Sequence, residues 1–374
     1  MGSPPVSAVV LHQVDTHQGR ARVEQLRPKE RSNDALSLRF KTFAAEECSG
    51  DSGLNVLSPT YGALSLAVAS NPDLLGLARE CMVGQPIPNL FFSAVKRVLA
   101  DYPDDDLSER YARCARDGRP TPDLAQVFDR FCSAHDQEIR ELVRTRRVQT
   151  NEIRRCSYMM PAFGVIANEN PGRHLALIDV GASAGLNLLW DSYRYSYSDG
   201  STYGPPDSNV LIEAETRTPM PSIPRQFPPI SFRTGIDLSP VDLGDDEEYN
   251  WMMALVWPDH TDRAELLAAA RRIWLEDPPS VLAGDAVALL PGVLTRVPAD
   301  AVLCVFHCHT LNQFPIEARS AFYEVLMRES ESRIVYHVPS EGERMSVDRI
   351  EERQSTTILS ARRNAHGRWI EWDT

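Results

Sequence analysis

The residues best suited to chemistry lie in one stretch, 175–191, and at the ends of the strands expected beside it. Its first half, 175–180, is an apolar run with β-branched residues, which predicts a strand buried on both faces. Gly181, Ser183 and Gly185 follow at alternate positions, and from Leu186 the apolar spacing suits a helix. A strand, a Gly-rich turn and a helix together present backbone N–H groups to a ligand at the carboxyl end of a sheet.

Two kinds of site fit this stretch, and the residues leave both open. Asp179 and the turn 181–185 have the spacing Asp-x-Gly-x-x-x-Gly, which resembles the S-adenosylmethionine-binding first motif of Rossmann-like methyltransferases. The same turn is also a literal Gly-x-Ser-x-Gly, the nucleophile elbow of a hydrolase, with Ser183 as the nucleophile. A Gly-rich turn that binds no ligand is the third interpretation.

Acidic residues stand where two further strands are expected to end. Residues 230–237 end in Asp237 before Ser-Pro, and a carboxylate there accepts hydrogen bonds from both hydroxyls of a ribose or caps the next helix. Asp285 and the N–H of Ala286 follow a short apolar strand, where they would reach an adenine edge. One adenosine-type ligand explains these strand ends, which predicts a cofactor site made by Asp179, Gly181, Ser183, Gly185, Asn187, Asp237, Asp285 and Ala286. A hydrolase would draw on Asp285 and on His307 or His309, but it leaves Asp237 unexplained.

Size, charge and cysteine content narrow the class of protein. A chain of 374 residues is long enough for two domains, and the net charge of −13 disfavours nucleic acid as a partner. The 7 cysteines are scattered, which indicates reduced thiols. No apolar run could cross a bilayer and no signal peptide is evident, so we expect a cytoplasmic protein without a membrane partner. The expected partner is a small-molecule substrate, free or bound to a carrier protein, and a small protein subunit is a further candidate.

The elements that position these residues divide into two domains after a flexible arm, residues 1–33. Residues 34–165 carry mainly helical patterns and predict a helical cap domain. Strand and helix patterns alternate within 166–374, which predicts an α/β domain with a mostly parallel sheet of the Rossmann-like class I methyltransferase type. Residues 356–361 and 367–372 predict a terminal antiparallel hairpin, which is typical of that type.

A dense polar run, 146–155, lies where the two domains should meet. It is either a solvated helix face or the wall of a polar pocket, because consecutive Gln, Thr and Asn are poor helix formers. A cap over the strand ends would enclose a site with Tyr61, Glu152, His307 and Glu341 as catalytic residues and Gln149, Asn151, Arg155 and Tyr193 as substrate-binding residues. Glu152 or Glu341 is the expected base, because burial raises the pKa of a carboxyl group. The alternative is that these groups only hold the domains together.

The residues Cys304, His307, Cys308 and His309 also invite a zinc site. Adjacent residues of a strand point to opposite faces, so His307 and Cys308 could not share one ion. No second cluster of metal-ligating residues stands out, and we therefore expect no metal.

The chain is similar to a bacterial family, the domain of unknown function 2332. The motifs that carry the resemblance are 147–152 and 179–193, with shorter matches at 58–61, 88–90, 235–240, 256–258, 284–285, 305–307 and 341–342. Family members often carry His where Lys96 stands, and Cys308-His309 is unusual.

The resemblance implies an S-adenosylmethionine methyltransferase-like fold behind a helical domain. Some relatives are associated with natural-product pathways in which an aziridine ring closes with displacement of a sulfate-type leaving group. The expected function is therefore an SN2 alkyl transfer to nitrogen or oxygen of a small metabolite, or such a ring closure. The expected cofactor is S-adenosylmethionine, which a non-methylating member would lack.

Overall fold

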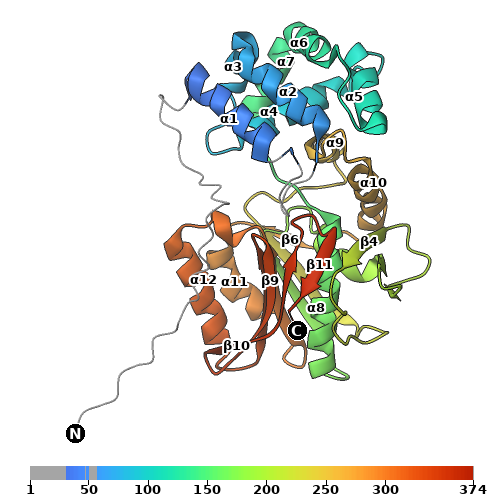
Figure 1. Cartoon of the computed structure of the whole chain (residues 1–374). Coiled ribbons are helices and arrows are strands. Elements are labelled where there is room, and N and C mark those ends of the chain that lie inside the picture. The colour runs from blue at the N-terminus through green and yellow to red at the C-terminus, as the bar shows by residue number, and fades with distance from the viewer. Residues whose placement is uncertain (1–30, 47, 50–56, 374) are drawn as a thin grey trace.

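The computed structural model describes residues 31–46, 48–49 and 57–373. Figure 1 shows a helical part above an α/β part, with α9 and α10 lying beside the connection between them. Most of the expected N-terminal arm, residues 1–33, lies outside the described residues. No helix in the described ranges has both the length and the apolar character needed to cross a membrane.

The helical part packs around aromatic side chains. Its helices are α1 (Asn33–Glu46), α2 (Pro59–Ser70), α3 (Pro72–Ala78), α4 (Ile87–Leu99), α5 (Asp106–Asp117), α6 (Leu124–Ala134) and α7 (Asp136–Thr145). Ser58 caps α2 by accepting a hydrogen bond from the N–H of Tyr61, and Pro59 takes the first helical position. Phe40 packs edge-on against Phe91 and Phe92 in the core between these helices.

The described strands form one large mixed sheet. They are β1 (Leu175–Val180), β2 (Arg194–Tyr197), β3 (Thr202–Tyr203), β4 (Leu211–Thr216), β5 (Ile230–Asp237), β6 (Val281–Ala283), β7 (Val302–Cys308), β8 (Val335–Glu341), β9 (Arg344–Glu351), β10 (Gln354–Arg363) and β11 (Trp369–Trp372). Their order is β3-β2-β4-β11-β10-β9-β8-β7-β1-β5-β6. The strands β6, β5, β1, β7 and β8 are parallel, and β8 to β11 form an antiparallel meander.

This architecture confirms the predicted α/β class, with a helical N-terminal part and antiparallel strands at the C-terminus. The hairpin of β10 and β11 is present, but β9 was not predicted and precedes it. The helix expected from Leu186 is the short 3-10 helix η3 (Leu186–Ser192), with non-helical dihedral angles at Leu189. The segment has no room for an α-helix of ordinary length, because β2 already begins at Arg194.

Helices cover both faces of the sheet. The helices α11 (Ala286–Leu294) and α12 (Ile316–Glu329) pack on one face, and α8 (Cys156–Glu169) and α10 (Thr261–Glu276) pack on the other. The helix α9 (Asp246–Leu255) joins the two cores, because Met252 packs with the sheet and Leu255 packs with the helical part. The sheet's carboxyl edge therefore faces the helical part (Figure 1).

Candidate active site

The carboxyl ends of β1, β7, β8 and β10 bring four polar or reactive side chains to one face of the sheet. The strand register places Asp179, Cys308, Ser340 and Arg363 on the face that α8 covers. They share this face because side chains alternate along each strand and paired residues lie side by side. Tyr158 of α8 packs over them, with its Oη 3.1 Å from Cys308 Sγ.

Several of these buried polar atoms have no hydrogen-bond partner among the described residues. Arg363 has an exposed fraction of 0%, and none of its three guanidinium nitrogens is hydrogen-bonded. Asp179 Oδ2, Ser340 Oγ and Glu341 Oε2 are also without a partner. Buried polar groups in proteins are nearly always paired, so such a group of atoms at a strand-end edge indicates a ligand site.

Arg155 supplies a second cation at this edge. It is half-buried before the first residue of α8, and its Nε donates to Ala365 O at 3.2 Å. Burial would lower the pKa of Arg155, but Cys308 and Tyr158 raise it. The sequence analysis placed Arg155 among substrate-binding residues, and the structure places it beside the unpartnered groups.

Asp179 is the carboxyl group with the properties of a base. Burial raises the pKa of Asp179 well above its usual range, and the nearby charge of Asp237 raises it further. The cation of Arg155 opposes both effects. A carboxyl group with a raised pKa and one free oxygen can accept a proton near neutral pH.

The predicted raised pKa of Glu152 and Glu341 is wrong. Burial would raise the pKa of Glu341, but hydrogen bonds from His307 and from backbone N–H groups lower it below the usual value. Burial would also raise the pKa of Glu152, but Arg263 and His366 lower it below the usual value. The two carboxylates have partners that the sequence does not reveal.

His307 and Cys308 point to opposite faces, as predicted. His307 Nδ1 lies 2.8 Å from Glu341 Oε1 and its Nε2 lies 3.1 Å from His337 Nε2, on the face that carries α12. His309 adopts a left-handed φ of 54° and has an Nε2 without a partner among the described residues. Burial and the cations Arg155 and Arg363 lower the pKa of His309. Within the described ranges no group of three or more acidic, His or Cys side chains has a metal-binding arrangement.

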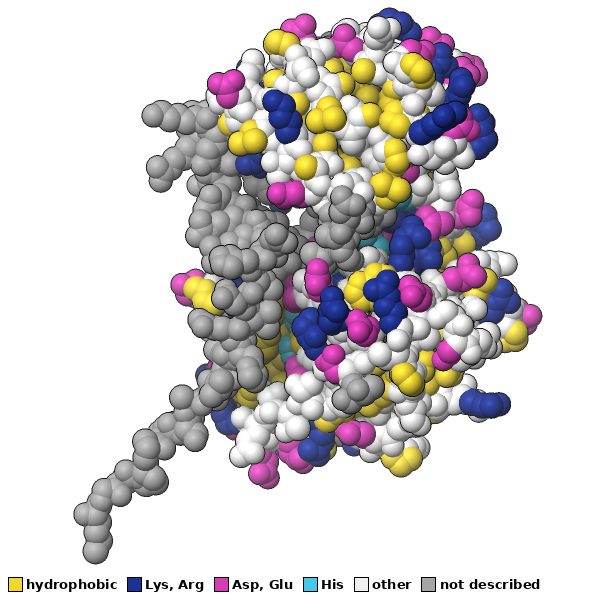
Figure 2. All heavy atoms as spheres, viewed as in Figure 1, with side chains coloured by type: hydrophobic (Ala, Val, Ile, Leu, Met, Phe, Trp, Pro, Cys, Tyr) yellow, Lys and Arg dark blue, Asp and Glu magenta, His cyan; other side chains and the backbone are white. Residues whose placement is uncertain are grey.

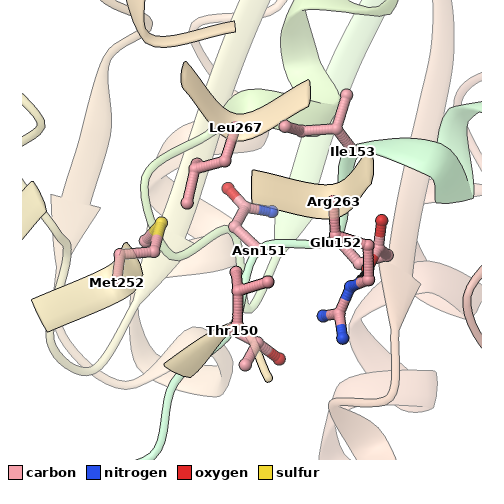
Figure 3. Close-up of a pocket in the computed structure, with 8 residues that line it drawn as sticks. Thr150, Asn151, Glu152, Ile153, Met252, Arg263 and Leu267 are labelled. Atoms are coloured by element: carbon pink, nitrogen blue, oxygen red, sulfur yellow. Dashed lines mark ion pairs between the residues drawn. The ribbon is translucent and has the colours of Figure 1, made fainter. Parts of the chain in front are cut away.

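The polar run 146–155 is largely extended and partly buried, so it is not a solvated helix face. Glu152 forms an ion pair with Arg263 of α10, and its Oε2 lies 3.2 Å from His366 Nδ1. Figure 3 shows Asn151, Glu152 and Arg263 around a small pocket that Met252 and Leu267 complete. The pocket volume is about 10 Å³, which is room for one water molecule and not for a substrate.

The Gly-rich turn is occupied by contacts within the chain. The N–H groups of Gly181 and Ala182 donate to Ile236 O, and that of Ser183 donates to Asp237 Oδ2 at 2.8 Å. A Cβ at Gly181 would lie 2.2 Å from Thr310 Oγ1, so the space beside this glycine is filled. These backbone groups are not free to hold a ligand.

The other residues predicted for the cofactor or substrate make structural contacts. Gln149 Nε2 donates to Asp237 Oδ1 at 3.0 Å, and Asn151 Oδ1 accepts from Leu186 N. Asn187 Oδ1 accepts a hydrogen bond from Cys156 Sγ, and Tyr193 Oη donates one to Leu186 O. Gly185 has a φ of 76° and packs against Pro279. Asp285 caps α11, and Ala286 is the first residue of that helix. Their assignment to a cofactor stays a prediction.

Tyr61 lies in the core of the helical part. It is 1% exposed and its ring stacks on Phe92 at 4.5 Å between centroids. Burial and Asp259 raise its pKa well above the usual value. Tyr61, Gln149 and His307 do not line the pocket that holds Asn151 and Glu152, so the expected single cavity is not formed by this set.

The hydrolase alternative has no assembled triad within the described residues. Ser183 Oγ is buried without a partner, although its φ of 55° resembles the strained turn of an elbow. Asp285 caps α11, and the ring of His307 is engaged by Glu341 and His337. No base is therefore positioned to activate Ser183.

The sequence analysis missed Arg363, Tyr158 and His366. The alternation of side chains along β10 is one sequence signal for Arg363. Ala361 faces the core, and Arg363 stands two residues later on the same face. An arginine at an inward position has to be paired or functional. Tyr158 gave no signal beyond an apolar helix.

Comparisons with known proteins identify the family of the chain and no individual relative. Neither the curated proteins nor the solved structures include a match to the chain. A family model described as "Uncharacterized protein conserved in bacteria (DUF2332)" matches residues 38–372. The chain therefore belongs to this bacterial family.

Proposed function

We propose that the chain is an enzyme that carries out an SN2 displacement on a small molecule at the carboxyl edge of the sheet. The observation that carries this proposal is that buried polar atoms without partners among the described residues lie at the carboxyl ends of several neighbouring strands, Asp179 Oδ2 on β1, Ser340 Oγ on β8 and the Arg363 guanidinium on β10. A displacement needs a base for the nucleophile, a holder for the leaving group and exclusion of water. Asp179 and Arg155 are suited to the first two tasks, and the cation of Arg155 acts on Asp179.

The version that the geometry supports best is closure of an aziridine ring by an amine. Asp179 Oδ2 accepts a proton from the amine, whose nitrogen forms a bond to the carbon that bears the sulfate ester, one carbon beyond the carbon to which the nitrogen is already attached. The bond between that carbon and the sulfate oxygen breaks, and its electron pair leaves with the sulfate. Arg155 is the group that would hold this anion, because its cation acts on Asp179 and a guanidinium offers paired donors to an oxyanion.

Methyl transfer from S-adenosylmethionine has less support from the residues present. The cofactor would rest on the turn 181–185, whose N–H groups at 181–183 and 185 are bonded within the chain. Asp237 already accepts hydrogen bonds from Gln149, Ser183 and Ser239. These residues do not fit an open cofactor cradle, so we derive no step through it, and S-adenosylmethionine binding stays an untested prediction.

The test is release of inorganic sulfate from β-amino sulfate esters, beginning with 2-aminoethyl hydrogen sulfate and continuing with larger amino alcohol sulfates. We expect saturable sulfate release by the wild-type chain that is lost in Asp179→Asn. Calorimetric titration with S-adenosylmethionine and S-adenosylhomocysteine is the second arm. Cofactor binding without sulfate release would favour methyl transfer, and failure of both arms would remove the support for an SN2 reaction.

A further inference from the structure

We propose that Arg363, together with Arg155 and His309, forms a binding site for a singly charged oxyanion, the carboxylate or sulfate ester group of a small organic molecule. The inference rests on the proposed function only for the location of the substrate, and it names the substrate class that this location selects. The sequence predicts Arg155 as a substrate-binding residue, but it does not predict a role for Arg363.

The first observation is the state of the Arg363 guanidinium. Its backbone N–H donates to Glu343 O at 2.8 Å, while its Nε and both terminal nitrogens have no hydrogen-bond partner within the described residues. The side chain is 0% exposed. The neighbouring Arg362 is exposed and reaches Glu371 at 3.3 Å, so only the inward arginine is left without an anion.

The second observation is what surrounds this guanidinium. Its Cζ lies 4.9 Å from the ring centroid of Tyr158, a contact that orients the guanidinium plane but supplies no hydrogen-bond acceptor. Arg155 reaches the same strand end, because its Nε donates to Ala365 O at 3.2 Å, and the cations of Arg155 and Arg363 both lower the pKa of His309. The cations of Arg155 and Arg363 and the unpartnered Nε2 of His309 therefore lie at the same strand end. No carboxylate among the described residues pairs with Arg363.

An unpaired buried cation is costly for the folded chain, and arginine cannot escape that cost by losing its proton. Stability alone would favour an apolar side chain at this position, because apolar replacements for buried charged groups are often neutral or stabilising. The arrangement becomes favourable once an oxyanion accepts hydrogen bonds from the guanidinium fork. Arg155, His309 and His366 are half-buried, so a ligand would have to enter beside these side chains.

The charge of the ligand follows from the acidic groups at the same edge. Glu341 and Glu152 have lowered pKa values and are ionised near neutral pH. They would repel a phosphate dianion more than a carboxylate or a sulfate ester, each of which carries one negative charge. A ligand with one negative charge is therefore favoured over a dianion at this edge.

The experiment is calorimetric titration of the full chain with sodium methyl sulfate, sodium acetate and inorganic phosphate at constant ionic strength. We expect one binding site for methyl sulfate or acetate in the millimolar range and weaker binding of phosphate. Arg363→Met should weaken the preferred anion at least about tenfold, because a hydrogen bond to a charged group is lost. Arg363→Lys, which keeps the charge without the fork, should weaken it less, and the exposed Arg362→Met should bind as the wild type does.

A second measurement separates a binding role from a structural one. Without added anion, Arg363→Met should unfold at the same or a higher urea concentration than the wild type. A strongly destabilised Arg363→Met, anion binding within twofold of the wild type in that variant, or no binding of methyl sulfate and acetate by the wild type would each overturn the site. Anion binding that depends on Arg363 without turnover of any sulfate ester would overturn the proposed reaction alone.

Discussion

Glu341 Oε1 lies 2.8 Å from His307 Nδ1, while Glu341 Oε2 is buried with no partner among the described residues. The backbone N–H groups of Thr310 and Leu311 also donate to Oε1, at 2.9 and 3.0 Å. Donors gathered on one oxygen keep the carboxylate ionised, while the other oxygen has no partner within the described ranges. With His307 donating through Nδ1, His337 must supply the Nε2–H between the two rings.

Replacement of His307 tests this network. His307→Leu removes one donor from Glu341 and leaves His337 Nε2 unpaired in a buried place, which should lower the free energy of unfolding by about 2 kcal/mol. Urea denaturation monitored by fluorescence gives the difference. The exposed His174→Leu is the control and should change stability by less than about 0.5 kcal/mol. Equal stability of the two variants would show that the network does not stabilise the fold.

The ion pair of Glu152 and Arg263 should hold α10 against the polar run 146–155. Both side chains are buried, at 3% and 7% exposed, so Glu152→Gln leaves a buried cation and should cost about 3 kcal/mol. Glu152→Met combined with Arg263→Met should recover most of this loss. The exposed pair of Glu215 and Arg217 is the control, and Glu215→Gln should cost less than about 1 kcal/mol. A stable, inactive Glu152→Gln would instead support the catalytic role expected from the sequence.

Asp179→Asn should change stability in a pH-dependent way as well as abolish turnover. Because the folded-state pKa of Asp179 is raised, the ionised form opposes folding at pH values above the usual range of an aspartate. Asparagine removes that charge, so the variant should gain stability relative to the wild type at pH 8 and lose the gain toward pH 4. Urea denaturation at both pH values measures the difference, with the exposed Asp300→Asn as control. A constant difference would mean that Asp179 titrates normally.

Acid should destabilise the fold before its carboxylates titrate. Burial lowers the pKa of His366 to about 4 and that of His260 to about 3, and it also lowers those of His309 and His337. The unfolded chain binds these protons near pH 6.5 and the folded chain does not, so stability falls as pH drops from about 6.5 toward 4. Each such histidine contributes on the order of 2 kcal/mol between pH 7 and 5. Denaturation midpoints that stay constant over this interval would contradict the assignment.

Ser183 should not behave as a nucleophile. Its Oγ has no histidine or carboxylate partner within the described residues, so a fluorophosphonate probe should leave it unmodified. Mass spectrometry of the treated chain, beside a known serine hydrolase as positive control, gives the answer. Labelling that disappears in Ser183→Ala would revive the hydrolase alternative.

Local sequence signals predicted the elements well. The buried strand at 175–180 and the C-terminal hairpin both depend on neighbours in the chain, and both are present in the structure. The short 3-10 helix after Gly185 and the extra strand β9 were missed. The lengths of these two elements depend on where the next strand pairs in the sheet, which is set by the tertiary structure.

The sequence by itself determined the α/β class, the acidic and Gly-rich strand ends and the opposite directions of His307 and Cys308, because short periods and local turn chemistry encode them. Only the tertiary structure decided which charges are paired. Glu152 meets Arg263 and His366 from distant parts of the chain, which reverses the expected direction of its pKa. The tertiary structure likewise leaves the Arg363 guanidinium and one oxygen of Asp179 without hydrogen-bond partners among the described residues. Hydrogen bonds and ion pairs depend on a few ångströms in three dimensions, and residue spacing along the chain does not specify them.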